Sequence, residues 1–213
     1  MTVKVCGMRD PQNIRDIIRA GADWIGMIFH PASPRFVSHV PEFEAEGAGR
    51  AGVFADAAEE DITAAAVRYG LDIVQLHGSE TPETVRRLRN ALCLAAGRRI
   101  MTVKAFGISA PGDFGACRAY EDCADLFLFD TKCRCLGGSG RQFDWSILDK
   151  YEGGTPFLLS GGIGPEDAPR LRELAHPKMA GVDINSRFEL SPAVKDAVAV
   201  REFIKKIKER NRT

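Results

Sequence analysis

The segment VKVCGMRDPQNIRDIIRAGADWIGMIF, residues 3–29, contains the pattern that decides the fold. A short run rich in β-branched residues, VKVCG at 3–7, ends at a glycine, and a second apolar run, WIGMIF, occupies 24–29. Between them, Asp10 suits a helix N-cap, Pro11 suits the first helical turn, and the isoleucines that follow fall on one helical face. The segment therefore predicts a strand, a helix and a second strand, which is the unit of a parallel sheet.

The same rhythm repeats along the whole chain. Apolar runs recur about every 20 to 30 residues, and most intervals between them show helical periodicity and helix-boundary residues. The runs are VKVCG (3–7), WIGMIF (24–29), AGVFA (51–55), IVQLHG (73–78), IMTVKAFG (100–107), LFLFD (126–130), FLLSGG (157–162) and AGVDI (180–184). The predicted helices include 11–22, 59–70, 81–92, 164–174 and 191–210, and the interval 41–50 has the weakest helical pattern.

Eight strands alternating with helices predict an α/β protein, and in a chain of this length they favour a closed (β/α)8 TIM barrel. We expect residues 1–213 to form this single barrel domain. A doubly wound open sheet is the alternative architecture. A barrel places its active site at the carboxyl ends of the strands, where polar residues of this chain gather.

Composition and charge exclude several classes of protein. Lys plus Arg and Asp plus Glu number 29 each, so the zero net charge gives no general attraction to nucleic acid or to a membrane surface. No apolar stretch has the length of a membrane span, and Lys4 interrupts the N-terminal run, so we expect neither a membrane segment nor a signal peptide. The six cysteines are sparse in a chain with an ample core, which favours free thiols and a cytoplasmic location.

Polar residues and glycines follow several of the predicted strands at their carboxyl ends. The candidate site residues are Cys6, Arg35, His77, Asp130, Gly161, Gly162, Asp183, Asn185 and Ser186. Four of them have a structural alternative: Cys6 as an inert core thiol, Asp130 as a turn cap, His77 as a hydrogen-bonded structural residue and Arg35 as a member of a surface ion pair. Their repetition on successive strand ends of one barrel favours a functional site.

The glycine-rich and cysteine-containing loops give no sign of a metal or a nucleotide. Cys133 and Cys135 form a C-x-C pair without the further ligands that a zinc site needs, so we expect no metal. The GGSG segment at 137–140 and the GGIG segment at 161–164 match neither a Walker loop nor a complete dinucleotide-binding pattern. They are typical of turns that let backbone amides approach an anion.

The loops after the seventh and eighth strands predict a phosphorylated small-molecule substrate. Barrels often bind phosphate between these two loops, where backbone N–H groups and a short helix converge. The corresponding segments here are SGGIGPED at 160–167 and GVDINSRFE at 181–189. Across the mouth of the barrel, the Arg35 guanidinium is suited to hold a substrate carboxylate in a bidentate pair.

Six motifs occur in order along the chain: KVCGMRD (4–10), SPRFV (33–37), VQLHG (74–78), FDT (129–131) with GGSGRQFDW (137–145), LSGGI (159–163) and GVDINS (181–186). Taken together, they resemble the phosphoribosylanthranilate isomerase family of tryptophan biosynthesis over nearly the whole chain. The chain departs from the usual family pattern after the eighth strand, where it has Asn185, Ser186, Arg187 and Phe188 and the family often has a small or glycine-containing continuation.

The resemblance implies a (β/α)8 barrel that uses neither a metal nor an organic cofactor. It implies an Amadori rearrangement of N-(5-phosphoribosyl)anthranilate to the 1-deoxyribulose 5-phosphate product. By position in the family motifs, Cys6 would be the general base, Asp130 the general acid and Arg35 the partner of the anthranilate carboxylate. We expect a monomer or a homodimer, with no nucleic-acid or membrane partner.

Two other functions are compatible with parts of the pattern. Lys104 could form the Schiff base of a barrel aldolase if it lay at the carboxyl end of its strand, and the chain could bind a phosphorylated metabolite without catalysis. A related isomerase of the histidine pathway performs the same chemistry but usually has aspartate at the end of the first strand, so Cys6 argues against it.

Strand alternation makes a further prediction about the barrel interior. Lys4 and Cys6 have the same parity on the first strand and should both point inward. Asp183 has the parity of an inward residue on the eighth strand, which adjoins the first once the barrel closes. Because a buried lysine needs a partner, we expect a Lys4–Asp183 ion pair, and a cation at this place would favour the Cys6 thiolate. The alternative is that Lys4 points outward between the helices.

Overall fold

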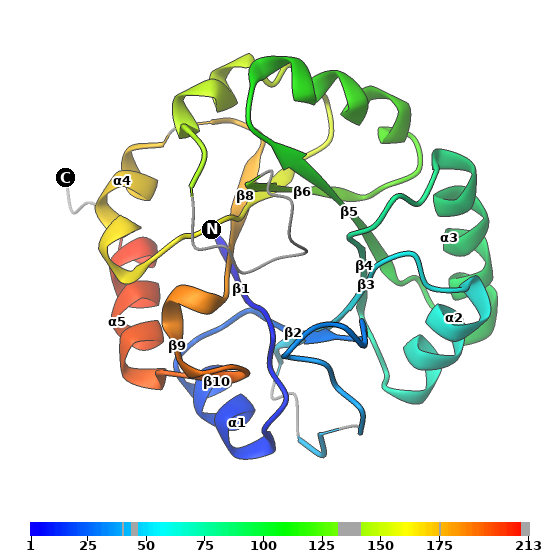
Figure 1. The fold of residues 1–213 in the computed structure, drawn as a ribbon, viewed down its shortest axis with the longest axis horizontal. Coiled ribbons are helices and arrows are strands. Elements are labelled where there is room, and N and C mark those ends of the chain that lie inside the picture. Colours follow the sequence, from blue (N-terminus) through cyan, green and yellow to red (C-terminus); the bar gives the residue numbers. More distant parts are fainter. Residues whose placement is uncertain (40, 44–46, 132–141, 175, 210–213) are drawn as a thin grey trace.

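The structure, a computed structural model, describes residues 1–39, 41–43, 47–131, 142–174 and 176–209. Eight parallel strands form a closed barrel in sequence order, with β8 paired back to β1 (Figure 1). The strands are β1 (Thr2–Val5), β2 (Trp24–Ile28), β3 (Gly49–Phe54), β4 (Ile73–Leu76), β5 (Met101–Ile108), β6 (Leu126–Thr131), β7 (Phe157–Leu159) and β8 (Met179–Ile184). The TIM-barrel prediction is confirmed, and the open doubly wound sheet is wrong.

Helices form a ring outside the barrel, as the view down the barrel in Figure 1 shows. The α-helices are α1 (Pro11–Arg19), α2 (Glu59–Arg68), α3 (Pro82–Ala96), α4 (Ala168–Glu173) and α5 (Ala197–Lys208), and 3-10 helices are η1 (Pro111–Tyr120), η2 (Trp145–Lys150), η3 (Pro165–Asp167) and η4 (Ser186–Phe188). Within the described part of the chain, no helix combines the length and apolar character needed to cross a membrane.

The predicted helix boundaries follow from local hydrogen bonds. The Asp10 carboxylate accepts a hydrogen bond from the Asn13 backbone N–H at 2.7 Å and so caps α1, while Thr81 caps α3 in the same way. These side chains satisfy backbone donors that have no partner inside the helix. Gly70 follows α2 with a φ of 59°, a left-handed conformation that ends the helix.

The C-terminal helix starts later than the sequence pattern predicts. Residues before Ala197 form a short antiparallel hairpin of β9 (Glu189–Ser191) and β10 (Val194–Lys195), and Asp196 then caps α5. Helical periodicity alone hid this hairpin, because its turn depends on Ala193, whose φ of 69° breaks the helix. The described residues of 41–50 contain no helix and instead lead into β3.

Apolar side chains form two separate layers, one inside the barrel and one between the strands and the surrounding helices. Inside the barrel, a small cluster includes Ala51, Val103, Leu128 and Leu158. Outside, larger clusters pack the other face of each strand against the helices. Alternation along the strands produces this division, and it leaves the interior positions near the carboxyl ends for polar side chains.

Candidate active site

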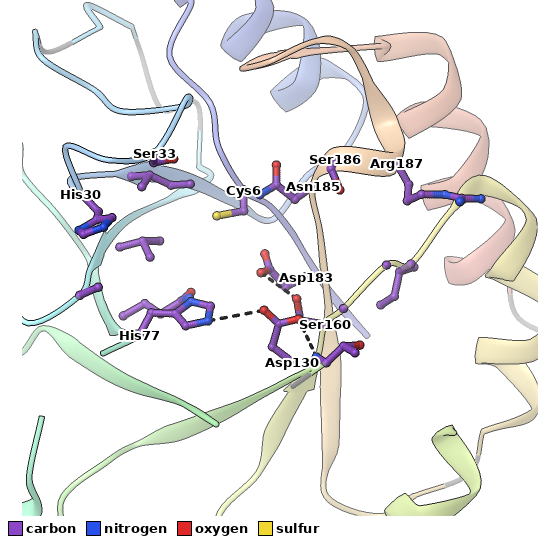
Figure 2. A pocket seen from close by; sticks show the side chains of 18 of the residues that line it. Cys6, His30, Ser33, His77, Asp130, Ser160, Asp183, Asn185, Ser186 and Arg187 are labelled. Carbon is purple, nitrogen blue, oxygen red and sulfur yellow. Dashed lines mark hydrogen bonds and ion pairs between the residues drawn. The ribbon is translucent and has the colours of Figure 1, made fainter. Parts of the chain in front are cut away.

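A pocket opens at the carboxyl ends of the barrel strands, where a TIM barrel carries its active site. It brings together all the predicted site residues except Arg35 (Figure 2). Its lining consists of Cys6, Ile28, His30, Ser33, Val53, Phe54, Ala55, Gln75, His77, Asp130, Thr131, Ser160, Gly161, Gly162, Ile163, Asp183, Asn185, Ser186 and Arg187.

Cys6 directly follows β1 and is held there by the neighbouring strands. Its backbone N–H donates to the Ile184 carbonyl at 2.9 Å, which fixes it beside the end of β8. Its thiol lies over Gly26 of β2, where a β-carbon would be 3.0 Å from the sulfur. In Figure 2 the sulfur points into the pocket, which His77 and Asp130 also line. Cys6 is therefore a buried thiol that lines the site rather than the outer core.

The predicted Lys4–Asp183 ion pair is present in the barrel interior. Lys4 Nζ lies 2.9 Å from Asp183 Oδ1, and only 1% of the lysine side chain is exposed. The two residues are register partners on β1 and β8, which explains why alternation and barrel closure predicted the contact. Ser160 Oγ lies 3.4 Å from the second Asp183 oxygen. The outward alternative for Lys4 is wrong.

The Lys4 ammonium is also close to the Cys6 thiol. A β-carbon on Gly26 would lie 3.1 Å from Lys4 Nζ, on the same side as the Cys6 sulfur. Burial raises the pKa of Cys6, and the Lys4 charge lowers it only in part. Burial alone would lower the pKa of Lys4, but the Asp183 carboxylate and Cys6 outweigh it and raise that pKa. Lys4 thus favours the thiolate as predicted, but burial has the larger effect.

Replacing Lys4 with methionine should move the titration of Cys6 to higher pH. The substitution removes the cation that lowers the thiol pKa and leaves the buried Asp183 carboxylate, which raises it. The pH at which kcat/KM rises should therefore shift upward. Lys104→Met is the matched control, because Lys104 is a second buried lysine whose Nζ is paired 3.1 Å from Glu80. If the pH profile of kcat/KM were unchanged in Lys4→Met, Lys4 would have no influence on the titration of Cys6.

Asp130, at the end of β6, is oriented from two sides. Its Oδ1 accepts the Thr131 backbone N–H at 2.8 Å, and its Oδ2 lies 3.5 Å from His77 Nε2. The other ring nitrogen of His77, Nδ1, lies 3.2 Å from the Gln75 amide nitrogen. In this arrangement Nδ1 accepts from Gln75, so Nε2 carries the ring proton and faces the carboxylate. His77 therefore links Gln75 to Asp130 through its two ring nitrogens. Figure 2 shows its contact with Asp130.

Gly161 allows the loop after β7 to approach Asp130. Its φ is 90°, and a β-carbon there would lie 2.2 Å from Thr131 Oγ1 and 2.9 Å from Asp130 Oδ1. A larger residue would clash and be strained. Gly162 also has a positive φ, 68°. Gly161 and Gly162 follow β7, and Asn185 and Ser186 follow the neighbouring β8, so the residues predicted to bind a phosphate line the same pocket.

Arg35 lies beside the pocket but does not line it. Its guanidinium forms a bidentate pair with Glu189, with Nε and Nη2 at 2.7 and 2.6 Å from the two carboxylate oxygens. The residue is 12% exposed, so this is a largely buried pair rather than the surface ion pair of the structural alternative. Sequence reasoning identified Arg35 but missed Glu189, which lies 154 positions away.

Two other residues from the sequence analysis, Lys104 and Arg187, lie outside the chemical centre. Lys104 does not line the pocket, and its Nζ donates to the Gly78 carbonyl at 2.7 Å in addition to pairing with Glu80. Arg187 lines the pocket edge but pairs with Glu166 and extends away from Cys6 in Figure 2. Cys133 and Cys135 lie outside the described residues.

Sequence reasoning also missed Gln75. Its side chain is 1% exposed, it lines the pocket, and its Oε1 has no hydrogen-bond partner among the described residues. A buried polar residue at the same strand parity as His77 was the available signal. His30, Ser33, Thr131 and Ser160 line the pocket as well, and nothing in their local sequence distinguishes them from ordinary loop residues.

The fold and pocket define a class of protein: a (β/α)8 barrel with a thiol, a carboxylate and glycine loops at the carboxyl ends of its strands. The family model described as N-(5'-phosphoribosyl)anthranilate (PRA) isomerase matches residues 3–206. The chain belongs to this family.

Individual members of the family are similar to this chain over nearly their whole length. The N-(5'-phosphoribosyl)anthranilate isomerase of Phocaeicola vulgatus is 48% identical over 210 residues, covering 99% of each chain. That of Thermotoga neapolitana is 37% identical and covers 97% of this chain and 98% of the relative.

Solved structures of the family have the same fold. Phosphoribosyl anthranilate isomerase from Thermotoga maritima superposes with a TM-score of 0.76 at 31% identity, covering 98% of each chain. A structure of the isomerase in complex with reduced 1-(o-carboxyphenylamino)-1-deoxyribulose 5-phosphate gives a TM-score of 0.74 at 30% identity over 98% of each chain. The likeness to these isomerases leaves the aldolase alternative without support.

Proposed function

We infer that this chain catalyses the isomerisation of N-(5-phosphoribosyl)anthranilate to 1-(2-carboxyphenylamino)-1-deoxyribulose 5-phosphate, a step of tryptophan biosynthesis. The observation that supports this best is the presence of Cys6 and Asp130 in the lining of one pocket, in a chain whose residues 3–206 match the isomerase family. The reaction moves hydrogen within one molecule and consumes no water, oxidant or reductant. A general acid and a general base are the groups it requires.

The proposed steps assign the proton transfers to these two residues. Asp130 gives a proton to the ring oxygen of the sugar, the ring opens, and a Schiff base forms between carbon 1 and the anthranilate nitrogen. The Cys6 thiolate then removes the proton from carbon 2, which gives an enolamine. The Cys6 thiol returns a proton to carbon 1 and the carbon 2 hydroxyl gives its proton to the Asp130 carboxylate, which forms the ketone and restores both residues. The positive Schiff base stabilises the thiolate during the second step.

The surrounding side chains suit these assignments. Lys4 offsets part of the cost of forming a thiolate in a buried place. His77 presents its Nε2 proton to the Asp130 carboxylate that remains after the first transfer. The substrate phosphate is proposed to bind between Gly161, Gly162 and the Asn185–Ser186 loop, chiefly through backbone amides. Asp183 is assigned to hold Lys4 from within the pocket.

Replacing Arg35 with alanine should raise KM by about tenfold or more and change kcat much less, because a charged contact to the substrate carboxylate is lost. Steady-state kinetics with the anthranilate substrate measures the effect. Arg86→Ala is the control, since Arg86 makes a comparable bidentate pair with Asp122 on the exposed surface. An unchanged KM in Arg35→Ala would remove Arg35 from the substrate site.

Growth complementation tests the proposed function and separates it from non-catalytic binding of a phosphorylated metabolite. Expression of this chain should restore growth without tryptophan to an auxotroph that lacks the isomerase. The Cys6→Ala variant, expressed at the same level, should not restore it. Failure of the wild-type chain, when it is present and folded, would contradict the proposed function.

We also propose a location, an oligomeric state and a domain organisation for the enzyme. The described cysteines, Cys6, Cys93, Cys117 and Cys123, are free thiols, which supports a cytoplasmic location. A monomer or homodimer is proposed, since a structure of the Thermotoga maritima isomerase describes monomers generated from a dimeric form. The family match over residues 3–206 supports treating residues 1–213 as one domain.

A further inference from the structure

A buried group of charges lies behind the rim of the pocket, on the β9–β10 hairpin. Glu189 accepts hydrogen bonds from Arg35 Nε and Nη2 at 2.7 and 2.6 Å and from Lys195 Nζ at 2.6 Å. The Ala193 backbone N–H adds a fourth at 3.0 Å. Glu189 and Lys195 are 7% and 0% exposed, so both charges are held away from water. One carboxylate thus serves two cations, which leaves one positive charge in excess.

The geometry of the arginine pair determines which part of Arg35 remains for a ligand. A guanidinium has five N–H groups arranged along two edges that can each grip a carboxylate. Glu189 occupies the edge formed by Nε and Nη2. The second edge, which includes Nη1, lies outside this pair and has the same spacing for a second carboxylate.

The charged group is connected to the pocket through Asn185. Lys195 Nζ donates to Asn185 Oδ1 at 2.7 Å, and Asn185 lines the pocket. A β-carbon on Gly7 would lie 2.5 Å from Arg35 Cδ and 2.8 Å from Asn185 Oδ1, so these two side chains meet over the residue that follows Cys6. Movement of Glu189 would therefore release both Arg35 and, through Lys195, Asn185.

The carboxylate keeps its charge under all ordinary conditions. Burial alone would raise the pKa of Glu189, but hydrogen bonds from Arg35 and Lys195 outweigh it and lower the pKa to about 2. The Glu189 carboxylate is therefore ionised at neutral pH, while burial lowers the pKa of its partner Lys195.

We propose that Glu189 is a positioning residue for substrate recognition: it holds Arg35 by one edge so that the other edge receives the anthranilate carboxylate, and it fixes Asn185 through Lys195. The inference rests on the proposed function, because it takes Arg35 as the carboxylate partner. It adds that the specificity for a carboxylate-bearing substrate depends on a residue that does not touch the substrate.

The test compares two ligands that differ only in the carboxylate. One is the reduced product analogue, 1-(o-carboxyphenylamino)-1-deoxyribulose 5-phosphate in reduced form, and the other is its phenylamino counterpart without the carboxyl group. In titration calorimetry, Glu189→Gln should weaken binding of the first ligand by about tenfold more than it weakens binding of the second, so the preference for the carboxylate is lost. In kinetics, KM should rise while kcat changes little. Asp122→Asn, which breaks the surface pair with Arg86, should alter none of these values.

A second variant guards against a folding defect. Glu189→Gln leaves Lys195 buried and without its carboxylate, which is destabilising. The double variant Glu189→Gln/Lys195→Met removes both charges and should unfold at a higher temperature than the single variant. It should still lose the preference for the carboxylate-bearing ligand, because Arg35 is no longer held.

The outcomes separate this inference from the proposed function. If Arg35→Ala abolishes the preference for the carboxylate but both Glu189 variants retain it, Glu189 has only a structural role and the inference is wrong. If Arg35→Ala itself retains the preference, the assignment of Arg35 in the proposed function fails. Loss of the preference in all three variants, while the ligand that lacks the carboxylate still binds, is the result the inference predicts.

Discussion

Cys6→Ala should lower kcat by about a hundredfold or more, with a much smaller change in KM. The substitution removes the proposed base and leaves a small side chain beneath the substrate, so binding groups elsewhere in the pocket stay in place. Cys6→Ser should also be poor, because a hydroxyl is a far weaker acid than a thiol and yields almost no anion. Steady-state assays of product formation give kcat and KM for both variants.

Cys117→Ala is the matched control for this substitution. Cys117 is a free thiol as deeply buried as Cys6, but it belongs to η1 and the outer core. We expect this variant to turn over at close to the wild-type rate once it is folded. Near-normal turnover in Cys6→Ala would instead return Cys6 to the role of an inert core residue.

Asp130→Asn should produce a loss in kcat of similar size, about a hundredfold or more, because an amide has no proton to give to the ring oxygen. Asparagine keeps the shape of the side chain and an oxygen that accepts the Thr131 N–H, so the loop after β6 should be undisturbed. Affinity for the reduced product analogue should stay within a few fold. That split between kcat and binding distinguishes a proton donor from a turn cap.

Asp125→Asn serves as the control for Asp130. Asp125 lies just before β6, at the opposite end of the strand, where it accepts the Thr102 N–H at 2.8 Å and pairs with Arg89. Its substitution should lower the unfolding temperature and leave kcat close to normal. Equal losses of kcat in the two variants would mean that Asp130 acts through the stability of the barrel.

The parts of the site that strand periodicity determines were predictable from the sequence. Apolar runs located all eight strands, and residues directly after them, such as Cys6, His77 and Asp130, had to lie at one end of a parallel barrel. Alternation and closure of the barrel also predicted the pair between Lys4 and Asp183, 179 positions apart. These inferences work because a strand has a fixed two-residue period and a barrel a fixed order of neighbours.

The contacts made by loops were not predictable in the same way. Lys195 lies in a segment that reads as helical and Glu189 lies just before it, and their link to Arg35 depends on how the β9–β10 hairpin packs against α1 and the loop after β2. The pKa of Cys6 was also beyond sequence reasoning, since it depends on the balance between burial and a lysine charge. Loop conformation and desolvation have no periodic sequence signal.

The most direct test of the account is a product-formation assay with purified protein and N-(5-phosphoribosyl)anthranilate, run in parallel for wild type, Cys6→Ala and Asp130→Asn. We predict that the wild-type chain forms the carboxyphenylamino-deoxyribulose phosphate, and that each variant loses about a hundredfold or more in kcat while still binding the reduced product analogue. A wild-type chain that binds the substrate without forming this product, or variants that turn over at close to the wild-type rate, would contradict it.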